Sequence, residues 1–203
     1  MGYKRYNIAI IPPQAIVERA IAMSEALRKF DSFFVLDGKT LYPHISLYHA
    51  PFTEECLGDV IKKLEEVAAD TRSFPVRQEA YYPDQGVWVG VRYVADKAIL
   101  DLHTRVVEAT KGYRAQQDDV RYLARWAELG HKQRENIKDC GWTDSFALFS
   151  PHLSFTKLRQ PCADVPSHLP EHDFSFQVDH IALVERGEYG ACVGTVADFT
   201  LRK

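Results

Sequence analysis

Two histidines of this sequence lie in copies of one short motif whose residue types suit acid–base chemistry. The motif reads Pro-His-apolar-Ser-apolar and occurs as PHISL over residues 43–47 and as PHLSF over residues 151–155. With this composition, about 0.007 chance occurrences of the full pattern are expected. Two copies therefore indicate a shared role for both segments.

Each copy brings a histidine and a serine together if it lies on a β-strand, because residues two apart point to the same face. His44 would then share a face with Ser46. In the same way, His152 would share a face with Ser154. One neutral imidazole can take a proton from an attacking water, and a second, protonated imidazole can give one to a leaving oxygen. With serine hydroxyls donating to the charged oxygens, this set suits phosphodiester cleavage.

Residues near the motifs are candidates for contact with a substrate. Tyr48 and Thr156 continue the two motif faces by one alternate position, although a strand tyrosine also serves in core packing. Trp88 and Arg92 alternate on one predicted strand, where a ring could stack on a base and a guanidinium could contact a phosphate. An exposed hairpin face is the alternative for that pair. Lys157 could add positive potential.

The other six histidines lack the motif and are expected to be core or surface groups: His49, His103, His131, His168, His172 and His180. On a regular strand His49 would face away from His44, which argues against a shared metal. His168 and His172 have a metal-like spacing, but Pro170 lies between them and no third ligand is evident. We expect no metal or other cofactor, and a metal-dependent hydrolase using this pair is the weakest alternative.

The hydrophobic pattern predicts the elements that would hold the motifs. Helices are predicted over residues 14–30, 54–69, 96–113 and 118–139, the last with an apolar stripe ending before Gly141. A loop with at most one helical turn is expected over 160–173. Strands are predicted over residues 8–11, 41–48 (ending before Pro51), 74–82, 87–94, 146–156 (bent at Pro151), 174–185 and 191–201, with turns over 83–86 and 186–190.

The order of these elements is repeated along the chain: a helix, a strand with the motif, a connector and a hairpin occur twice. We therefore predict an α+β protein in which residues 1–203 form one two-lobed domain. Each lobe would be an antiparallel sheet flanked by helices, with one motif at 44–46 and the other at 152–154. The two motifs would form the floor of a cleft between the pseudo-symmetric lobes.

Composition limits the partners of this chain. Its 203 residues, 46% hydrophobic and 26% charged, are those of an ordinary globular protein, and its net charge of -3 argues against coating long duplex nucleic acid. The four cysteines form no CxxC pair, which favours free buried thiols. The apolar run over residues 8–11 is too short for a signal peptide or membrane span. We expect a cytoplasmic monomer that takes a small phosphorylated ligand.

With its two motifs, the chain resembles the 2H phosphoesterase superfamily, which includes 2′-5′ RNA ligase-like proteins and 2′,3′-cyclic phosphodiesterases. The resemblance covers nearly the whole chain. It implies a metal-independent phosphodiesterase, with a reverse ligase activity as a further option, acting on a nucleotide cyclic phosphate or a 2′-5′ linked RNA end. His44, Ser46, His152 and Ser154 fall on the four catalytic positions of the family.

Two departures from the family pattern affect these expectations. Serine replaces the more common threonine, which keeps the hydroxyl but loses the methyl group that fixes its rotamer. The segment 116–139 is an enlarged region between the motifs, and a lid or a specificity element is expected there. A catalytically silent nucleotide or RNA-end binding module with the same cleft is the alternative function.

Overall fold

The computed structural model describes residues 2–82, 87–169 and 172–203, and it confirms the α+β class. The predicted turn over 83–86 lies outside these residues. Within the described ranges no helix has the length and apolar character needed to cross a bilayer. The strands are β1 (Tyr3–Ile10), β2 (Ile45–Thr53), β3 (Phe74–Val76), β4 (Gln78–Tyr82), β5 (Trp88–Tyr93), β6 (His152–Lys157), β7 (Phe176–Val178), β8 (His180–Arg186) and β9 (Cys192–Thr200), and the α-helices are α1 (Gln14–Leu27), α2 (Glu54–Ala69), α3 (Lys97–Thr110) and α4 (His131–Cys140).

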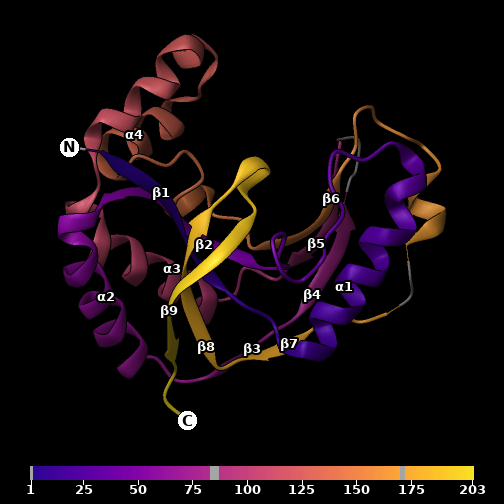
Figure 1. The fold of residues 1–203 in the computed structure, drawn as a ribbon, viewed down its shortest axis with the longest axis horizontal. Helices are drawn as coiled ribbons and strands as arrows, with labels where there is room; N and C mark the ends of the chain where they lie inside the picture. The colour runs from indigo at the N-terminus through magenta and orange to yellow at the C-terminus, as the bar shows by residue number, and fades with distance from the viewer. Residues whose placement is uncertain (1, 83–86, 170–171) are drawn as a thin grey trace.

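One antiparallel sheet of seven strands, in the order β4-β5-β6-β2-β1-β8-β9, forms the centre of the molecule. Strand β2 begins directly after His44 and β6 begins at His152, and these two strands are neighbours in this sheet. They meet at one residue pair, Ile45 opposite Leu153. The sheet therefore has two arms, β4-β5-β6 and β2-β1-β8-β9, which join at the motifs. The helices lie outside these arms (Figure 1).

Both halves of the sequence contribute to each arm. Helix α1, from the first half, packs on β6, whereas α3, from the second half, packs on β2. Strands β1 and β2 belong to the first half, and β1 pairs on its other side with β8 near the C-terminus. Strands β3 and β7 form a separate two-stranded sheet. The core side chains beneath the two motifs, Ile45, Leu47, Leu153 and Phe155, are fully buried.

The bounds of β2 differ from the prediction, because the strand begins only at Ile45 and continues through Pro51 to Thr53. A proline inside a strand is tolerated where no ladder N–H is required. The Pro51 carbonyl accepts a hydrogen bond from the Ala115 N–H at 2.9 Å, so this side of Pro51 faces away from β1. The missing donor of Pro51 thus falls outside the β1–β2 ladder.

The predicted strand 146–156 is also shorter than expected. Strand β6 starts at His152, and Phe146–Leu148 forms a short 3-10 helix instead. The predicted strand 74–82 divides at Arg77 into β3 and β4, which join different sheets. The loop over 160–173 carries one short 3-10 turn, Val165–His168, as predicted.

The predicted helix 118–139 is wrong in two respects. It is interrupted, since a 3-10 helix over Gln116–Glu128 is followed by extended backbone at Leu129 and Gly130 before α4 begins. Its apolar stripe is not a core face, because Val120 and Leu123 are 65% and 67% exposed. Gly141 ends α4 with a positive φ of 76°, as predicted for a residue just past a helix.

Candidate active site

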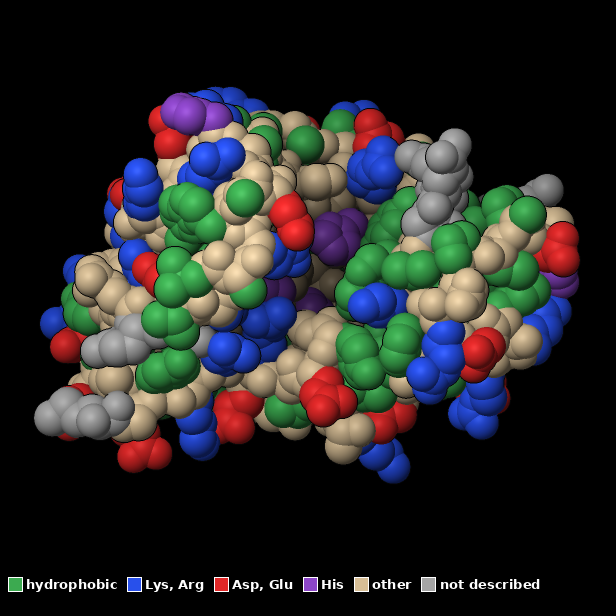
Figure 2. All heavy atoms as spheres, turned by 90° about the horizontal axis from the view of Figure 1, so that it is seen from above, with side chains coloured by type: hydrophobic (Ala, Val, Ile, Leu, Met, Phe, Trp, Pro, Cys, Tyr) green, Lys and Arg blue, Asp and Glu red, His purple; other side chains and the backbone are tan. Residues whose placement is uncertain are grey.

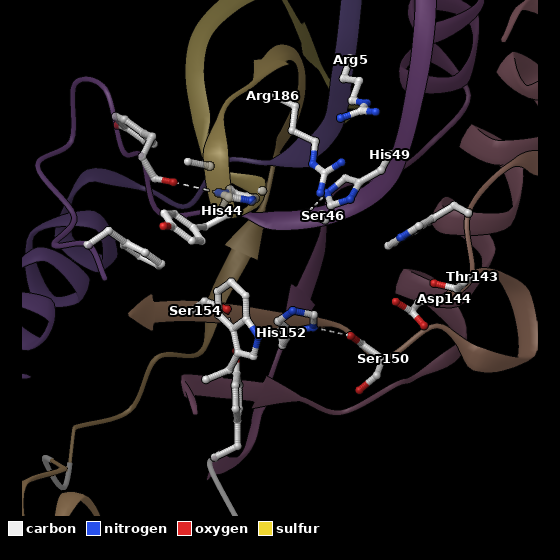
Figure 3. A pocket seen from close by; sticks show the side chains of 18 of the residues that line it. Arg5, His44, Ser46, His49, Thr143, Asp144, Ser150, His152, Ser154 and Arg186 are labelled. Carbon is white, nitrogen blue, oxygen red and sulfur yellow. Dashed lines mark hydrogen bonds between the residues drawn. The ribbon is translucent and has the colours of Figure 1, made fainter. Parts of the chain in front are cut away.

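A cavity of about 750 Å³ lies over the junction of β2 and β6, and the structure brings both motifs into it. His44 and Ser46 line one side of its floor, and His152 and Ser154 line the other. The histidine side chains lie at the bottom of a hollow between the two arms (Figure 2). The sequence-predicted pairs thus share one cavity, with His44 and Ser46 at the start of β2 and with His152 and Ser154 on β6 (Figure 3).

Both motif histidines are held by the same contact. The Nδ1 atom of His44 lies 2.8 Å from the Tyr42 carbonyl oxygen, and the Nδ1 atom of His152 lies 2.8 Å from the Ser150 carbonyl oxygen. A carbonyl only accepts hydrogen bonds, so Nδ1 carries the proton in each neutral ring. The Nε2 atom of each imidazole is then the atom that takes or gives a proton.

A β-bulge lies at the last residue of each motif and reverses the strand alternation after it. Along β2, Ser46 pairs with Ala9 and Tyr48 with Ile8, so Leu47 is an extra residue. Along β6, Ser154 pairs with Gly90 and Thr156 with Val89, so Phe155 is an extra residue. A bulge places two residues opposite one and shifts the faces of those that follow.

The two bulges explain why Tyr48 and Thr156 do not line the cavity. Both side chains are fully buried. The Tyr48 hydroxyl donates to the Cys140 carbonyl, and the Thr156 hydroxyl donates to the Phe34 carbonyl at 2.6 Å. Burial raises the pKa of Tyr48. The expectation that these two residues contact a substrate is corrected, because their hydroxyl groups bind backbone carbonyl oxygens in the protein interior instead.

His49 takes the place that regular alternation assigned to Tyr48. It lines the cavity, its Nε2 atom lies 2.9 Å from the Ser46 Oγ atom, and its ring lies 4.9 Å from the Trp142 ring. The corresponding residue after the second motif is Lys157, whose ammonium group lies over the rings of Trp88 and Tyr189. The expectation that His49 is merely a core or surface group is therefore wrong.

The two motif serines have different neighbours. Ser46 Oγ accepts a hydrogen bond from the Asn7 amide Nδ2 at 2.9 Å, in addition to its contact with His49. Ser154 Oγ lies 2.9 Å from the Tyr82 hydroxyl, and burial raises the pKa of that tyrosine. Gly90 lies between Tyr82 and Ser154 across the sheet, as their partner in both strand pairings.

Replacing Gly90 with alanine is expected to lower the free energy of unfolding by about 3 kcal/mol, as overpacking does. A Cβ atom there would lie 2.1 Å from the Leu153 carbonyl oxygen and 2.6 Å from the Tyr82 hydroxyl. Gly58→Ala is the matched control, because that exposed position in α2 has no atom within 4 Å and alanine should stabilise the helix by up to about 1 kcal/mol. Urea unfolding of both variants measures the difference, and equal stability would contradict the packing argument.

The surroundings of His44 and His49 favour their neutral forms. Burial lowers the pKa of His44 to about 4. The hydrogen bond to the Tyr42 carbonyl raises this pKa, and the nearby charges of His152 and Arg186 lower it further. Burial also lowers the pKa of His49 well below its usual range, helped by Arg186 and Arg121. His44 is half-buried while His152 is exposed, so the two motif positions are not equivalent in the fold.

Four arginines that the sequence patterns did not predict line the cavity. The predicted Trp88 and Arg92 both line the cavity, whereas Lys157 does not. The arginines that join Arg92 come from β1, β8 and the segment after α3, so no local motif connects them. They are Arg5, Arg121, Arg125 and Arg186.

The remaining histidines fit their expected structural roles. His103 is buried, with Nδ1 donating to the Leu47 carbonyl at 2.7 Å and Nε2 accepting from the Phe146 N–H at 2.8 Å. His168 packs against the Phe30 ring and does not line the cavity, and neither does His172. In the part of the chain that the structure describes, no three His, Cys, Asp or Glu side chains are grouped as a metal site.

Comparison with known proteins agrees with this arrangement. A family model described as the 2'-5' RNA ligase superfamily matches residues 12–190, a range that includes both motifs. The chain belongs to this superfamily. Its members are phosphoesterase-like and ligase-like, so the superfamily supports an enzyme of phosphodiesterase type. The resemblance to 2H phosphoesterases is thereby confirmed. No curated protein sequence gives a match.

Solved structures share the fold of this superfamily member at low sequence identity. TT0787 of Thermus thermophilus is 18% identical, with a TM-score of 0.64 over 98% of each chain. E. coli LigT complexed with NADP+ is 14% identical, with a TM-score of 0.61 over 100% of each chain. A protein described as a phosphoesterase is 16% identical, with a TM-score of 0.59 over 100% of each chain. These likenesses show the fold alone.

Proposed function

We propose that this chain is a metal-independent phosphodiesterase acting on 2′,3′-cyclic phosphates or 2′-5′ linkages of nucleotides or RNA ends. The observation that carries the proposal is the matched pair of histidines in one cavity, each fixed through Nδ1 by the carbonyl two residues earlier. Fixing both rings in the same tautomer prepares both Nε2 atoms for proton transfer. Superfamily membership supports the same class of reaction.

The reaction needs one base and one acid on either side of the phosphorus. The Nε2 atom of a neutral imidazole takes a proton from water while the water oxygen bonds to phosphorus. The bond from phosphorus to the ribose oxygen breaks, and the protonated imidazole gives its Nε2 proton to that oxygen. The hydroxyl groups of Ser46 and Ser154 donate to the non-bridging oxygens as their charge grows. A cyclic phosphate thus becomes a phosphomonoester.

We assign the base to His44. Its imidazole is half-buried beside the Arg186 guanidinium, which disfavours a second proton, so it is neutral at pH 7. His152 is exposed at the opposite side of the floor, where a charged imidazole keeps its contact with water. His152 is therefore assigned as the acid.

The nature of the ligand is supported by the fold relatives. E. coli LigT has been crystallised with NADP+, with 3'-AMP and with phosphate. In the present chain, Trp88 and Phe34 line the cavity near the motifs, and aromatic rings of this kind stack on nucleobases. A nucleotide with its phosphate over the two histidines fits this lining.

The proposal predicts hydrolysis of nucleoside 2′,3′-cyclic phosphates or of a 2′-5′ dinucleotide by the purified chain, at rates unchanged by EDTA. Proton transfer by imidazoles needs no metal, whereas a metal-bound nucleophile would be lost on chelation. Chromatography that separates 2′- and 3′-phosphates identifies the leaving oxygen. Loss of activity in EDTA that returns with divalent metal would overturn the metal-independent mechanism. Binding without turnover would favour the silent-module alternative.

The pH dependence of kcat/KM is expected to be a bell whose acid limb lies well below pH 6.5. The base must be unprotonated, and the folded protein lowers the pKa of His44 to about 4, so the active form persists to lower pH than for a free imidazole. The alkaline limb reports loss of the acid proton. An NMR titration of His44 in the wild type and in His152→Gln checks the assignment, because removing the His152 charge should raise the His44 pKa. An acid limb at or above pH 6.5 would rule out His44 as the base.

A further inference from the structure

Arginines are gathered in the cavity in larger number than cleavage of one phosphodiester requires. Five arginines line it, and the lining residues in the described part of the chain include one carboxylate, Asp144. The whole chain carries a net charge of -3, so this positive charge is specific to the cavity. A cleft lined by charge of one sign concentrates ligands of the opposite sign.

Three of these arginines surround the end of the cavity beyond Ser46. Arg5 on β1 and Arg186 on β8 extend side by side next to His49 (Figure 3). Arg121, on the 3-10 helix Gln116–Glu128, lines the same cavity as His49, and the charges of Arg186 and Arg121 both lower the pKa of that histidine. Arg121 is held there by donating to the Gly141 carbonyl at 3.0 Å. We call this region the arginine end.

A different lining occupies another part of the cavity. Phe34, Trp88 and Tyr189 form a cluster in which the Phe34 ring lies 6.2 Å from Trp88 and 5.9 Å from Tyr189. Hydrophobic side chains gather on one rim of the hollow, and Lys and Arg side chains gather on the opposite rim (Figure 2). The cavity thus offers separate places for an apolar ring and for anionic groups.

We propose that the arginine end binds a second phosphoryl group of the substrate, one that is not cleaved. The preferred substrates are then nucleotides with an additional phosphate, such as a 5′-phosphorylated cyclic phosphate, rather than cyclic mononucleosides. This inference rests on the proposed function. A cyclic phosphodiester carries one negative charge, which the serines and the protonated histidine already meet, whereas paired guanidinium groups match a further phosphate with bidentate hydrogen bonds. The cavity volume of about 750 Å³ leaves room for such a ligand.

The test compares adenosine 2′,3′-cyclic phosphate with the same compound carrying a 5′-phosphate. We expect kcat/KM to be about tenfold or more higher for the 5′-phosphorylated compound, mainly through a lower KM, because the second phosphate adds binding away from the reacting bond. The preference should shrink as salt is added, since screening weakens contacts between charges. Equal kcat/KM for the two compounds would overturn the inference.

Variants separate the arginine end from general effects of charge. Arg5 is an exposed residue of the arginine end, so Arg5→Gln should fold normally and reduce the preference to about threefold or less. Arg28→Gln is the matched control, because Arg28 lies outside the cavity in an exposed ion pair with Glu25. It should keep the wild-type preference. Loss of the preference in Arg28→Gln, or its survival in Arg5→Gln, would contradict the inference.

A binding measurement separates failure of this inference from failure of the proposed function. Calorimetry compares adenosine 3′,5′-bisphosphate with adenosine 3′-monophosphate, neither of which contains a diester to cleave. Tighter binding of the bisphosphate by about tenfold, without turnover of either cyclic compound or of a 2′-5′ dinucleotide, would support the arginine end and reject the phosphodiesterase. Equal binding of the two would reject the arginine end, whatever the activity.

Discussion

Replacement of His44 or His152 by alanine is expected to lower kcat/KM by about 10³-fold or more for each variant. Each histidine performs one of two proton transfers that occur in the same step, and acid–base catalysis by one positioned group contributes about 10² to 10⁴-fold. The double variant should be little worse than either single one, because groups that act as a unit are not additive. Initial rates with a cyclic phosphate or 2′-5′ substrate measure all three variants.

Folding of these variants can be checked independently of activity. Both side chains line a cavity rather than the core, so far-UV circular dichroism and thermal unfolding should resemble the wild type. His131→Ala is the control, because the side chain of His131 is 85% exposed on α4. It should keep full activity. Folded, fully active His44→Ala and His152→Ala proteins would show that this pair does not catalyse the reaction.

Ser46→Ala and Ser154→Ala are expected to lower kcat by about 30-fold to 10³-fold, equivalent to about 2 to 4 kcal/mol for loss of one oxyanion donor. At Ser46 the Asn7 amide nitrogen only donates, so it occupies a lone pair of the Ser46 oxygen, and the hydroxyl proton is left for a ligand in the tautomer in which His49 Nε2 also donates to that oxygen. At Ser154 the Tyr82 hydroxyl lies 2.9 Å from the serine oxygen on the same arm of the sheet, and either hydroxyl can be the donor.

The conservative replacement distinguishes loss of the hydroxyl from loss of packing. Ser46→Thr retains the hydroxyl and should recover activity to within about tenfold of the wild type. Separate measurement of kcat and KM is required, because a donor used in the transition state lowers kcat, whereas uniform binding changes KM. An alanine variant with unchanged kcat would remove its serine from the catalytic step.

The motifs could be predicted from sequence because strand alternation is regular up to the serines. The four motif residues reach one cavity, and α2 has the predicted bounds, since its apolar residues Val60, Leu64 and Val67 recur at helical spacing. The error began at the next residue. A bulge adds one residue without changing the residue types around it, so alternation counted through Leu47 or Phe155 assigns the wrong faces.

The arginines of the cavity could not be predicted by any local rule. Arg5 and Arg186 become neighbours only when β1 pairs with β8, and Arg121 joins them from an irregular segment. The exposed apolar stripe with Val120 and Leu123 misled the prediction for the same reason, because burial there depends on the tertiary position of the segment. Periodicity reports local geometry, and long-range pairing decides which surfaces meet.

Because strands from the two halves of the chain pair with each other, the sheet forms by closing long loops. Ile8 lies beside Leu183, and Ile45 beside Leu153, so the central pairings join residues far apart in sequence. Closing such loops costs chain entropy before contacts compensate, which slows folding. During synthesis, β1 and β2 can pair with each other early, whereas their outer neighbours β8 and β6 are made only later. Each half can pair some of its own strands, as in β1 with β2 and β8 with β9, but the two histidines come together only when strands from both halves have paired.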